Sequence, residues 1–124
     1  MRKVLLVGNC DYDAPRIQSF IESNFKTKVE DIKTMDEAMH KIETDKQDLI
    51  LVNRIGDKDQ RNGLELIDYM KNKNITTPIM LITNFQDKAE EAVEHGAIEG
   101  FGKEDIFGDN QESVIRILDP TLKD

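Results

Sequence analysis

Three short runs of consecutive apolar residues most restrict what this chain can fold into. They lie within residues 3–7 (KVLLV), 48–52 (DLILV) and 78–82 (PIMLI), where the last four residues of each segment are apolar. A strand with water on one face alternates apolar and polar side chains, whereas a strand buried on both faces is apolar at consecutive positions. We therefore expect these runs to be central strands of a parallel sheet that helices cover on both sides.

Segments with helical periodicity separate these runs. Helices are expected at residues 13–25, 34–43, 64–70, 87–95 and 111–118, and weaker strands at 28–32 and 98–101. Thr34 and Glu37 form a capping box at the second of these helices. Gly96 is expected to end the fourth helix, in which Val93 would face inward. Five strands alternating with five helices predict an α/β fold, a doubly wound five-stranded parallel sheet of the flavodoxin-like type, in a single domain over residues 1–124.

The composition restricts where the protein works and what it binds. The chain is 38% hydrophobic and 34% charged, and its apolar runs of four residues are too short for a membrane-spanning helix or a secretory signal. Its one cysteine, Cys10, fits a reducing compartment, so a cytoplasmic location is expected. A formal net charge of −8 argues against binding to nucleic acid or to an anionic membrane.

Ligand sites in doubly wound sheets form at the carboxyl ends of the strands. Those ends are expected at Gly8 and Asn9, at Asn53, at Thr83 and at residues 101–103. These positions are the first candidates for any chemistry that the fold supports.

Motifs around these strand ends resemble the receiver domain of two-component response regulators, over essentially the whole chain. They are KVLLVGN at 3–9, DLILVN at 48–53, PIMLITN at 78–84 and GAIEGFGK at 96–103. The segment NGLELIDYMK at 62–71 also resembles the helix that follows the phosphoacceptor loop. The order and spacing of the motifs together carry the resemblance.

The resemblance implies a site in which an aspartate accepts a phosphoryl group, an acidic pair helps to hold Mg²⁺, and a hydroxyl and a lysine bind the phosphoryl oxygens. Thr83 and Lys103 match the hydroxyl and lysine positions. The phosphoacceptor position falls on Asn53, and the acidic pair falls on Gly8 and Asn9. A carboxamide is a far poorer nucleophile than a carboxylate, and carboxylates usually hold Mg²⁺. We therefore expect no catalytic residue, no metal and no cofactor, because the Mg²⁺ site is lost.

Two further departures concern the switch and the charge of this site. The aromatic switch position of receivers maps to Gly100, and Phe101, one position later, is expected on the opposite face of the strand. Lys103 would lack its usual carboxylates, and we hypothesise that Asp11 and Asp13 reach back toward it.

Other candidate residues have simpler interpretations. Asn53 is equally well explained as a polar strand-end residue that hydrogen-bonds the neighbouring loop. Asp57 and Asp59 are spaced loosely like calcium ligands, but the loop lacks that motif's order and its final glutamate. Cys10 is interpreted as a small packed residue, and the two histidines as surface residues without a ligand partner.

The leading hypothesis is a stand-alone pseudo-receiver, not an enzyme, that acts in signal transduction by binding a protein. The partner would be a kinase, a regulator or another copy of the chain, and we expect a monomer or weak homodimer without an output domain. The partner surface is expected on the fourth helix, the fifth strand and the last helix. The candidate residues on this surface are Glu90, Glu91, Glu94, Phe101 and Ile106.

Two alternatives stay open. A phosphorylatable receiver would use a relocated acceptor, either Asp57 or Asp11. A flavodoxin-like small-molecule binder would use the crevice at the strand ends, although the sequence has no G-x-G-x-x-G, no P-loop and no Ser/His/Asp set.

Overall fold

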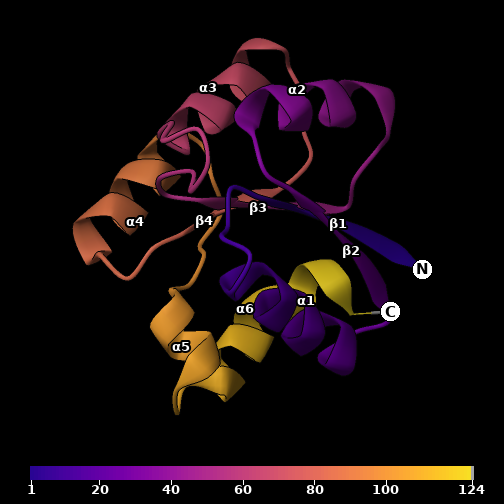
Figure 1. The fold of residues 1–124 in the computed structure, drawn as a ribbon, viewed down its shortest axis with the longest axis vertical. Helices are drawn as coiled ribbons and strands as arrows, with labels where there is room; N and C mark the ends of the chain where they lie inside the picture. The colour runs from indigo at the N-terminus through magenta and orange to yellow at the C-terminus, as the bar shows by residue number, and fades with distance from the viewer. Residues whose placement is uncertain (124) are drawn as a thin grey trace.

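The structure is a computed structural model that describes residues 1–123 (Figure 1). Its elements, in chain order, are β1 (Arg2–Val7), α1 (Asp13–Asn24), β2 (Thr27–Ile32), α2 (Met35–Thr44), β3 (Leu49–Asn53), α3 (Leu64–Asn72), β4 (Ile79–Ile82), α4 (Gln86–Glu94), α5 (Lys103–Phe107) and α6 (Gln111–Leu122). Strands and helices alternate as far as α4, so the predicted α/β architecture is confirmed in that part of the chain.

The strands form one parallel sheet in the order β2-β1-β3-β4. Val7 of β1 lies between Ile32 of β2 and Val52 of β3, and Asn53 lies opposite Ile82 of β4. The carboxyl ends of the strands therefore meet at one end of the sheet, where the loops into the helices gather.

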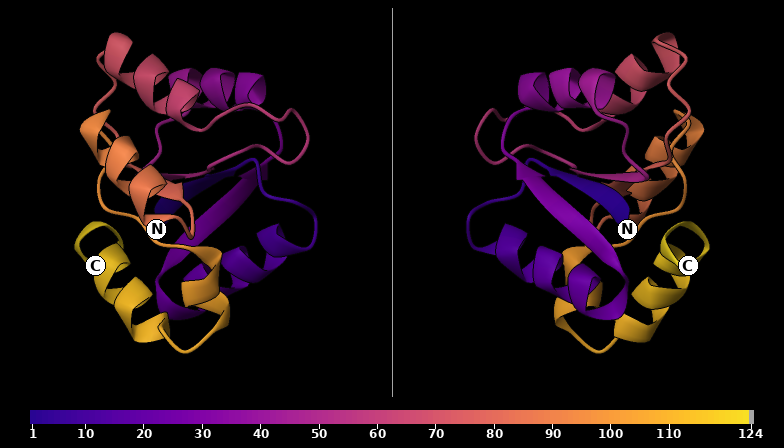
Figure 2. Two further views of the ribbon diagram at one scale, coloured as in Figure 1. Left: turned by 90° about the vertical axis from the view of Figure 1, so that its left-hand side faces the viewer. Right: turned by 90° about the vertical axis from the view of Figure 1, so that its right-hand side faces the viewer.

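Helices cover both faces of this sheet (Figures 1 and 2). One core contains residues of α1, α5 and α6, and the other contains residues of α2, α3 and α4. Successive residues of β1 alternate between them, because Val4 and Leu6 belong to the first core and Leu5 and Val7 to the second. Each of these side chains is at most 1% exposed, and full burial of such a side chain stabilises the fold by about 1.5–3 kcal/mol. The expected burial of consecutive apolar residues on both faces is confirmed.

The predicted fifth strand is wrong. Residues 98–101 run beside β4, but a single parallel bridge joins them to it, between Ile98 and Met80. Gly100 lies so close to β4 that a Cβ atom at that position would be 2.5 Å from the carbonyl oxygen of Leu81. Glycine supplies no side chain to pack and weakens a strand. The sheet formed by the described residues therefore has four strands rather than five.

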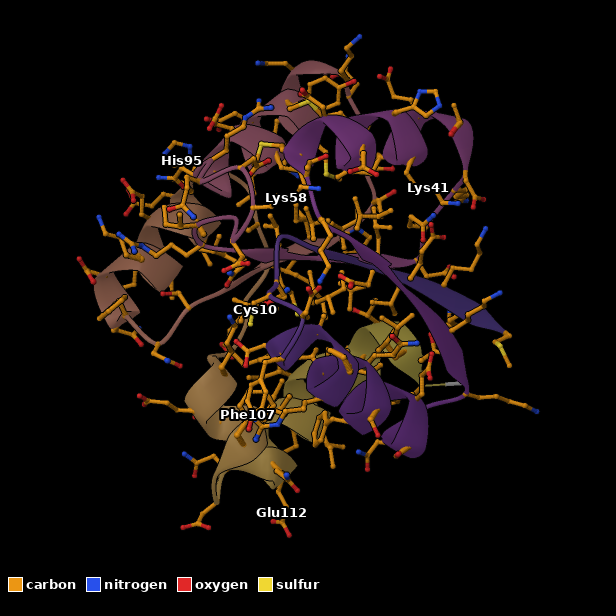
Figure 3. The ribbon with its side chains drawn as sticks, viewed as in Figure 1. Cys10, Lys41, Lys58, His95, Phe107 and Glu112 are labelled. Atoms are coloured by element: carbon orange, nitrogen blue, oxygen red, sulfur yellow. The ribbon has the colours of Figure 1, made fainter. Side chains whose placement is uncertain are left out.

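The last part of the chain also differs from the prediction. The unpredicted α5 begins at Lys103, where Asp105 accepts a hydrogen bond from the Gly102 N–H at 3.0 Å and caps the helix. It docks on α1 through Arg16, whose guanidinium lies 3.7 Å from the centre of the Phe107 ring (Figure 3). This contact joins residues that are far apart in sequence, so a local sequence pattern does not predict α5.

Two helix ends agree with the prediction, and one side chain does not. Thr34 accepts a hydrogen bond from the Glu37 N–H at 3.3 Å, and Gly96 has a φ of +115° after the end of α4, so both predicted ends are confirmed. Only half of the predicted capping box forms, because the Glu37 carboxylate accepts from the Thr34 hydroxyl, at 2.8 Å, rather than from the Thr34 N–H. Val93 does not face inward, because its side chain is 49% exposed. Within residues 1–123, no helix is long and apolar enough to cross a membrane.

Candidate functional site at the strand ends

Asn53 is the last residue of β3 and is half-buried. Its side-chain nitrogen donates hydrogen bonds to the carbonyl oxygen of Gly8 at 3.2 Å and to that of Ile55 at 2.8 Å. The amide therefore fastens the end of β3 to the end of β1 and to its own loop. A carboxylate in this position would direct a negative charge at two carbonyl oxygens, which an acceptor-only group cannot bond. The loop-bonding role predicted for Asn53 is present.

Gly8 follows β1 at a point where the backbone conformation disfavours a side chain and the neighbouring loop crowds it. Its φ is +81°, a left-handed conformation that favours glycine. A Cβ atom would lie 3.2 Å from the Cα of Gly56, and the Gly8 oxygen also accepts a hydrogen bond from the Asp57 N–H at 2.9 Å. An acidic side chain at this position would strain the turn.

Asn9 is fully buried. Its side-chain nitrogen lies 3.5 Å from the Val7 oxygen. The Asn9 carbonyl oxygen accepts a hydrogen bond from the Lys33 ammonium at 2.9 Å, and the same ammonium pairs with Asp31 at 2.9 Å and Asp11 at 3.0 Å. The hypothesis that Asp11 reaches Lys103 is therefore wrong, because Lys33 holds Asp11.

Asp13 does reach Lys103, as hypothesised. The Lys103 ammonium lies 2.9 Å from the Asp13 carboxylate, and both side chains are at most 25% exposed. Burial by itself would raise the pKa of the Asp13 carboxyl, but the hydrogen bond and charge of Lys103, with smaller contributions from Cys10 and Arg16, outweigh burial and hold this pKa below its ordinary value. The lysine is therefore neutralised by a carboxylate from α1 rather than by residues after β1.

Thr83, Asn53 and Lys103 come together at one small cavity of about 220 Å³. The Thr83 hydroxyl oxygen accepts a hydrogen bond from the Phe85 N–H at 3.1 Å. Sequence reasoning missed two further residues that line this cavity, Arg54 and Phe85, whose guanidinium and ring centre are 5.5 Å apart. Arg54 directly follows Asn53 in the sequence, and this position was the available sign that it lies near the site. The direction of its side chain depends on the fold, so the sequence alone does not place it in the cavity.

The residues at the strand ends do not fit a Mg²⁺ ion. Magnesium is normally bound through one or two carboxylates with water and phosphate. Here Gly8 has no side chain, the Asn9 side chain is buried, and the Asn53 nitrogen points a donor toward the carbonyl oxygens of Gly8 and Ile55. Within residues 1–123, no group of three or more His, Cys, Asp or Glu side chains is placed to hold a metal ion.

The loop after β3 uses Asp59 as an internal anchor. Its carboxylate accepts hydrogen bonds from the Met35 N–H at 2.8 Å, at the start of α2, and from the Arg61 N–H at 3.2 Å. Asp57 is exposed, and its side chain makes no hydrogen bond with the described residues. Of the two aspartates considered as calcium ligands, Asp59 therefore has a structural role, and Asp57 is a solvent-exposed side chain.

Cys10 lies by the start of α1, and His95 lies at the end of α4 (Figure 3). The Cys10 sulfur accepts a hydrogen bond from the Asp13 N–H at 3.4 Å, beside the start of α1. His95 is exposed, as predicted, and bonds to Asp68 of α3 at 2.8 Å. His40 is exposed on α2.

The predicted partner surface is only partly available. Glu90 and Glu94 are exposed on α4, and Glu91 is half-buried. Phe101 and Ile106 are 5% and 2% exposed, because both pack into the core beneath α1 and α6. Their assignment to the surface was wrong.

Solved receiver structures share this fold. The receiver domain of Francisella response regulator 1452 has a TM-score of 0.70 and 21% identity, over 94% of this chain and 93% of that chain. The signal receiver domain of a putative Luxo repressor protein from Vibrio parahaemolyticus has a TM-score of 0.82 and 21% identity, over 99% of this chain and 92% of that chain. NtrX from Brucella abortus has a TM-score of 0.81 and 17% identity, over 99% of this chain and 27% of that longer chain. At these identities the likeness shows the fold alone, and no curated protein matches.

The family itself is shown by a sequence model. The model of the response regulator receiver domain matches residues 4–105, a range that contains Gly8, Asn53, Thr83 and Lys103. This range is most of the chain and includes every strand end described above. The chain therefore belongs to the response regulator receiver domain family.

Proposed function

We propose that this chain is an atypical receiver, which works in two-component signalling by binding another protein and does not accept a phosphoryl group at the usual position. The observation that carries the proposal is the Asn53 amide, whose nitrogen donates to the carbonyl oxygens of Gly8 and Ile55. An amide has no negative charge and is a far poorer nucleophile than a carboxylate. Attack on phosphorus from this position is therefore not expected.

The missing carboxylates after β1 support the same proposal. Phosphoryl transfer depends on positive charge that offsets the charge of the phosphoryl oxygens, and Mg²⁺ normally supplies much of it. Gly8 and Asn9 offer no carboxylate to such an ion. Lys103 and Arg54 are the cations that line the cavity, and Lys103 is already paired with Asp13.

Contacts within the chain hold the loops at the carboxyl ends of the strands in place. Asn53 ties β3 to β1, Lys103 ties α5 to α1, and Asp59 ties the loop after β3 to α2. We expect these contacts to keep the domain in one conformation whether or not a phosphodonor is present. Its effect would then depend on the presence of its partner, which is a kinase, a regulator or a second copy, and the domain would not be an enzyme.

A phosphoryl mimic tests this proposal. The isotope-labelled protein is titrated with beryllofluoride in the presence of Mg²⁺, and the backbone amide shifts of Asn53, Thr83 and Lys103 are followed by NMR. No saturable shift at these residues is expected. Saturable shifts around Asn53 would contradict the proposal, and shifts confined to Asp57 or Asp11 would favour a relocated acceptor in its place.

A further inference from the structure

The segment that follows α4 leaves one edge of the sheet open. The Ile98 N–H donates inward to the Ile79 oxygen at 2.9 Å, and the Phe101 oxygen accepts from the Thr83 N–H at 3.2 Å. Between them, neither the N–H nor the C=O of Glu99 makes a hydrogen bond with any residue in the described part of the chain. An unpaired donor and acceptor side by side at a sheet edge are a template for another strand.

A groove lies on each side of this edge. On the α4 side, a groove of about 670 Å³ is lined by Val93 and by three acidic residues, Glu90, Glu94 and Glu99. On the α6 side, a groove of about 580 Å³ has the apolar residues Ile98, Ile117 and Pro120 in its lining, together with Arg116. Glu99 lines both grooves and is the residue that they share. α4 and α6 stand on opposite sides of the sheet at this edge (Figure 2, left).

The edge also exposes apolar surface. The side chains of Val93 and Ile98 are 49% and 40% exposed, one in each groove. Exposed apolar surface framed by charge is typical of an interaction site. Backbone groups, apolar area and charge therefore gather around a single residue, Glu99.

We infer that this edge binds an extended segment of a partner protein as an added strand beside Glu99. Successive side chains of a strand point to opposite faces of the sheet, so alternate residues of the segment enter the two grooves. The groove on the α4 side, with Glu90, Glu94 and Glu99, selects lysine or arginine. The groove on the α6 side, with Ile98, Ile117 and Pro120, selects apolar residues. The partner segment is therefore cationic on one face and apolar on the other.

Charge argues against a second copy of the chain as the occupant. Two copies that met at this edge would each bring Glu99 and the acidic face of α4, and each chain has a formal net charge of −8. Like charges placed across a strand pair destabilise it, and charged residues on an edge are a means of preventing self-pairing. A cationic segment gains from the same charges.

Peptide binding tests the inference, which depends on the proposed function because it names the chemistry of the partner. The probe is a short capped peptide of alternating lysine and valine, and two matched peptides serve as controls. One has glutamate in place of lysine, and the other has N-methyl groups on alternate backbone nitrogens. We expect saturable amide shifts at residues 98–101 with the first peptide, no binding of the acidic peptide, and binding at least about tenfold weaker for the methylated one.

Hydrogen exchange separates strand pairing from simple charge attraction. With the lysine–valine peptide bound, exchange of the Glu99 amide proton should slow by at least about tenfold. Shifts on α4 alone, with unchanged exchange at Glu99, would overturn the inference. A concentration-dependent dimer that protects the Glu99 amide without peptide would overturn the assignment of a cationic partner.

Two variants at one position complete the test. Glu99→Gln removes the charge and keeps the N–H, whereas Glu99→Pro removes both. We expect the proline variant to bind the peptide at least about tenfold more weakly than the glutamine variant. Equal binding would contradict strand pairing, and the methylated peptide gives the same answer if the proline variant does not fold. A negative result in the peptide-binding and hydrogen-exchange experiments leaves the beryllofluoride result unaffected. The proposed function and the proposed strand-binding edge can therefore fail separately.

Discussion

The side-chain nitrogen of Asn53 donates a hydrogen bond to the carbonyl oxygen of Gly8, 3.2 Å away, and so joins the carboxyl ends of β3 and β1. The same nitrogen donates to the Ile55 oxygen at 2.8 Å. Both acceptors are backbone groups that belong to the fold whatever side chain stands at position 53. The position is therefore built around a donor, which a carboxylate cannot be unless it is protonated.

The first prediction concerns the substitution Asn53→Asp. We expect it to lower the free energy of unfolding by about 1–3 kcal/mol at pH 7, because an ionised carboxylate would face two carbonyl oxygens. The folded state would favour the protonated carboxyl and raise its pKa, so the deficit should shrink as the pH falls through that raised pKa. Urea unfolding at several pH values measures this.

Asn72→Asp, on the exposed end of α3, is the matched control and should cost less than about 1 kcal/mol, because its added charge meets only the C-terminal end of a helix. An Asn53→Asp variant as stable as the wild type at pH 7, without divalent cations, would contradict the account of this position.

A second prediction concerns the ion pair of Lys103 and Asp13. A double-mutant cycle with Lys103→Met and Asp13→Asn should give a coupling of about 1–2 kcal/mol at neutral pH, since both side chains are largely buried. The folded-state pKa of Asp13 lies below its ordinary value of 3.8, so this stability is present above that value and is lost as the pH falls through the folded pKa.

Lys88→Met provides the comparison, because its ammonium lies 4.0 Å from Glu91 on exposed helix surface. It should change stability by less than about 0.5 kcal/mol. A coupling free energy near zero between Lys103 and Asp13 would contradict the claim that this ion pair stabilises the fold.

The third prediction concerns His95, which joins α4 to α3 through Asp68. The hydrogen bond with Asp68, together with the charges of Asp68, Glu91 and Glu94, raises the pKa of His95 above its ordinary value of 6.5. The contact therefore stabilises the fold most below that value, and its contribution is lost as the pH rises through the raised pKa. Asp68→Asn should lower the pKa of His95, as measured by NMR titration of the imidazole protons.

Asp36→Asn removes a carboxylate from α2 instead and should leave the His95 titration unchanged. A His95 pKa that does not move in Asp68→Asn would show that the ion pair is not formed in solution.

The fourth prediction separates two aspartates of one loop. Asp59→Ala should destabilise the fold by about 1–2 kcal/mol, because it leaves the Met35 and Arg61 N–H groups without their acceptor. Asp57→Ala, two residues earlier, should be nearly neutral because that side chain is exposed. Thermal unfolding of the two variants measures the difference, and equal effects would argue against the anchoring role.

The parts of the fold that could be predicted are those in which the local pattern and the tertiary structure agree. Residues 4–7, 49–52 and 79–82 are apolar at every pleat position, and burial on both faces is the only stable outcome for such strands. The candidate site at Asn53, Thr83 and Lys103 followed from the same topology, because carboxyl ends of parallel strands meet.

The features that were missed depend on contacts between distant residues. Residues 98–101 look like a strand, but the close approach of Gly100 to Leu81 interrupts the pairing. Val93 has the spacing of an inward residue, yet it lines a groove beside α4 and its side chain stays 49% exposed. Asp59 contacts Met35 across 24 positions, a partner that no local motif identifies.

The most direct test of the central claim is the intact mass of the protein after incubation with Mg²⁺ and a small acyl phosphate donor. The account predicts no increase in mass corresponding to a phosphoryl group. A phosphorylatable receiver treated in the same way shows that the donor is active. Stoichiometric addition of one phosphoryl group to the wild-type chain, located by peptide mapping on any residue lining the strand ends, would contradict it.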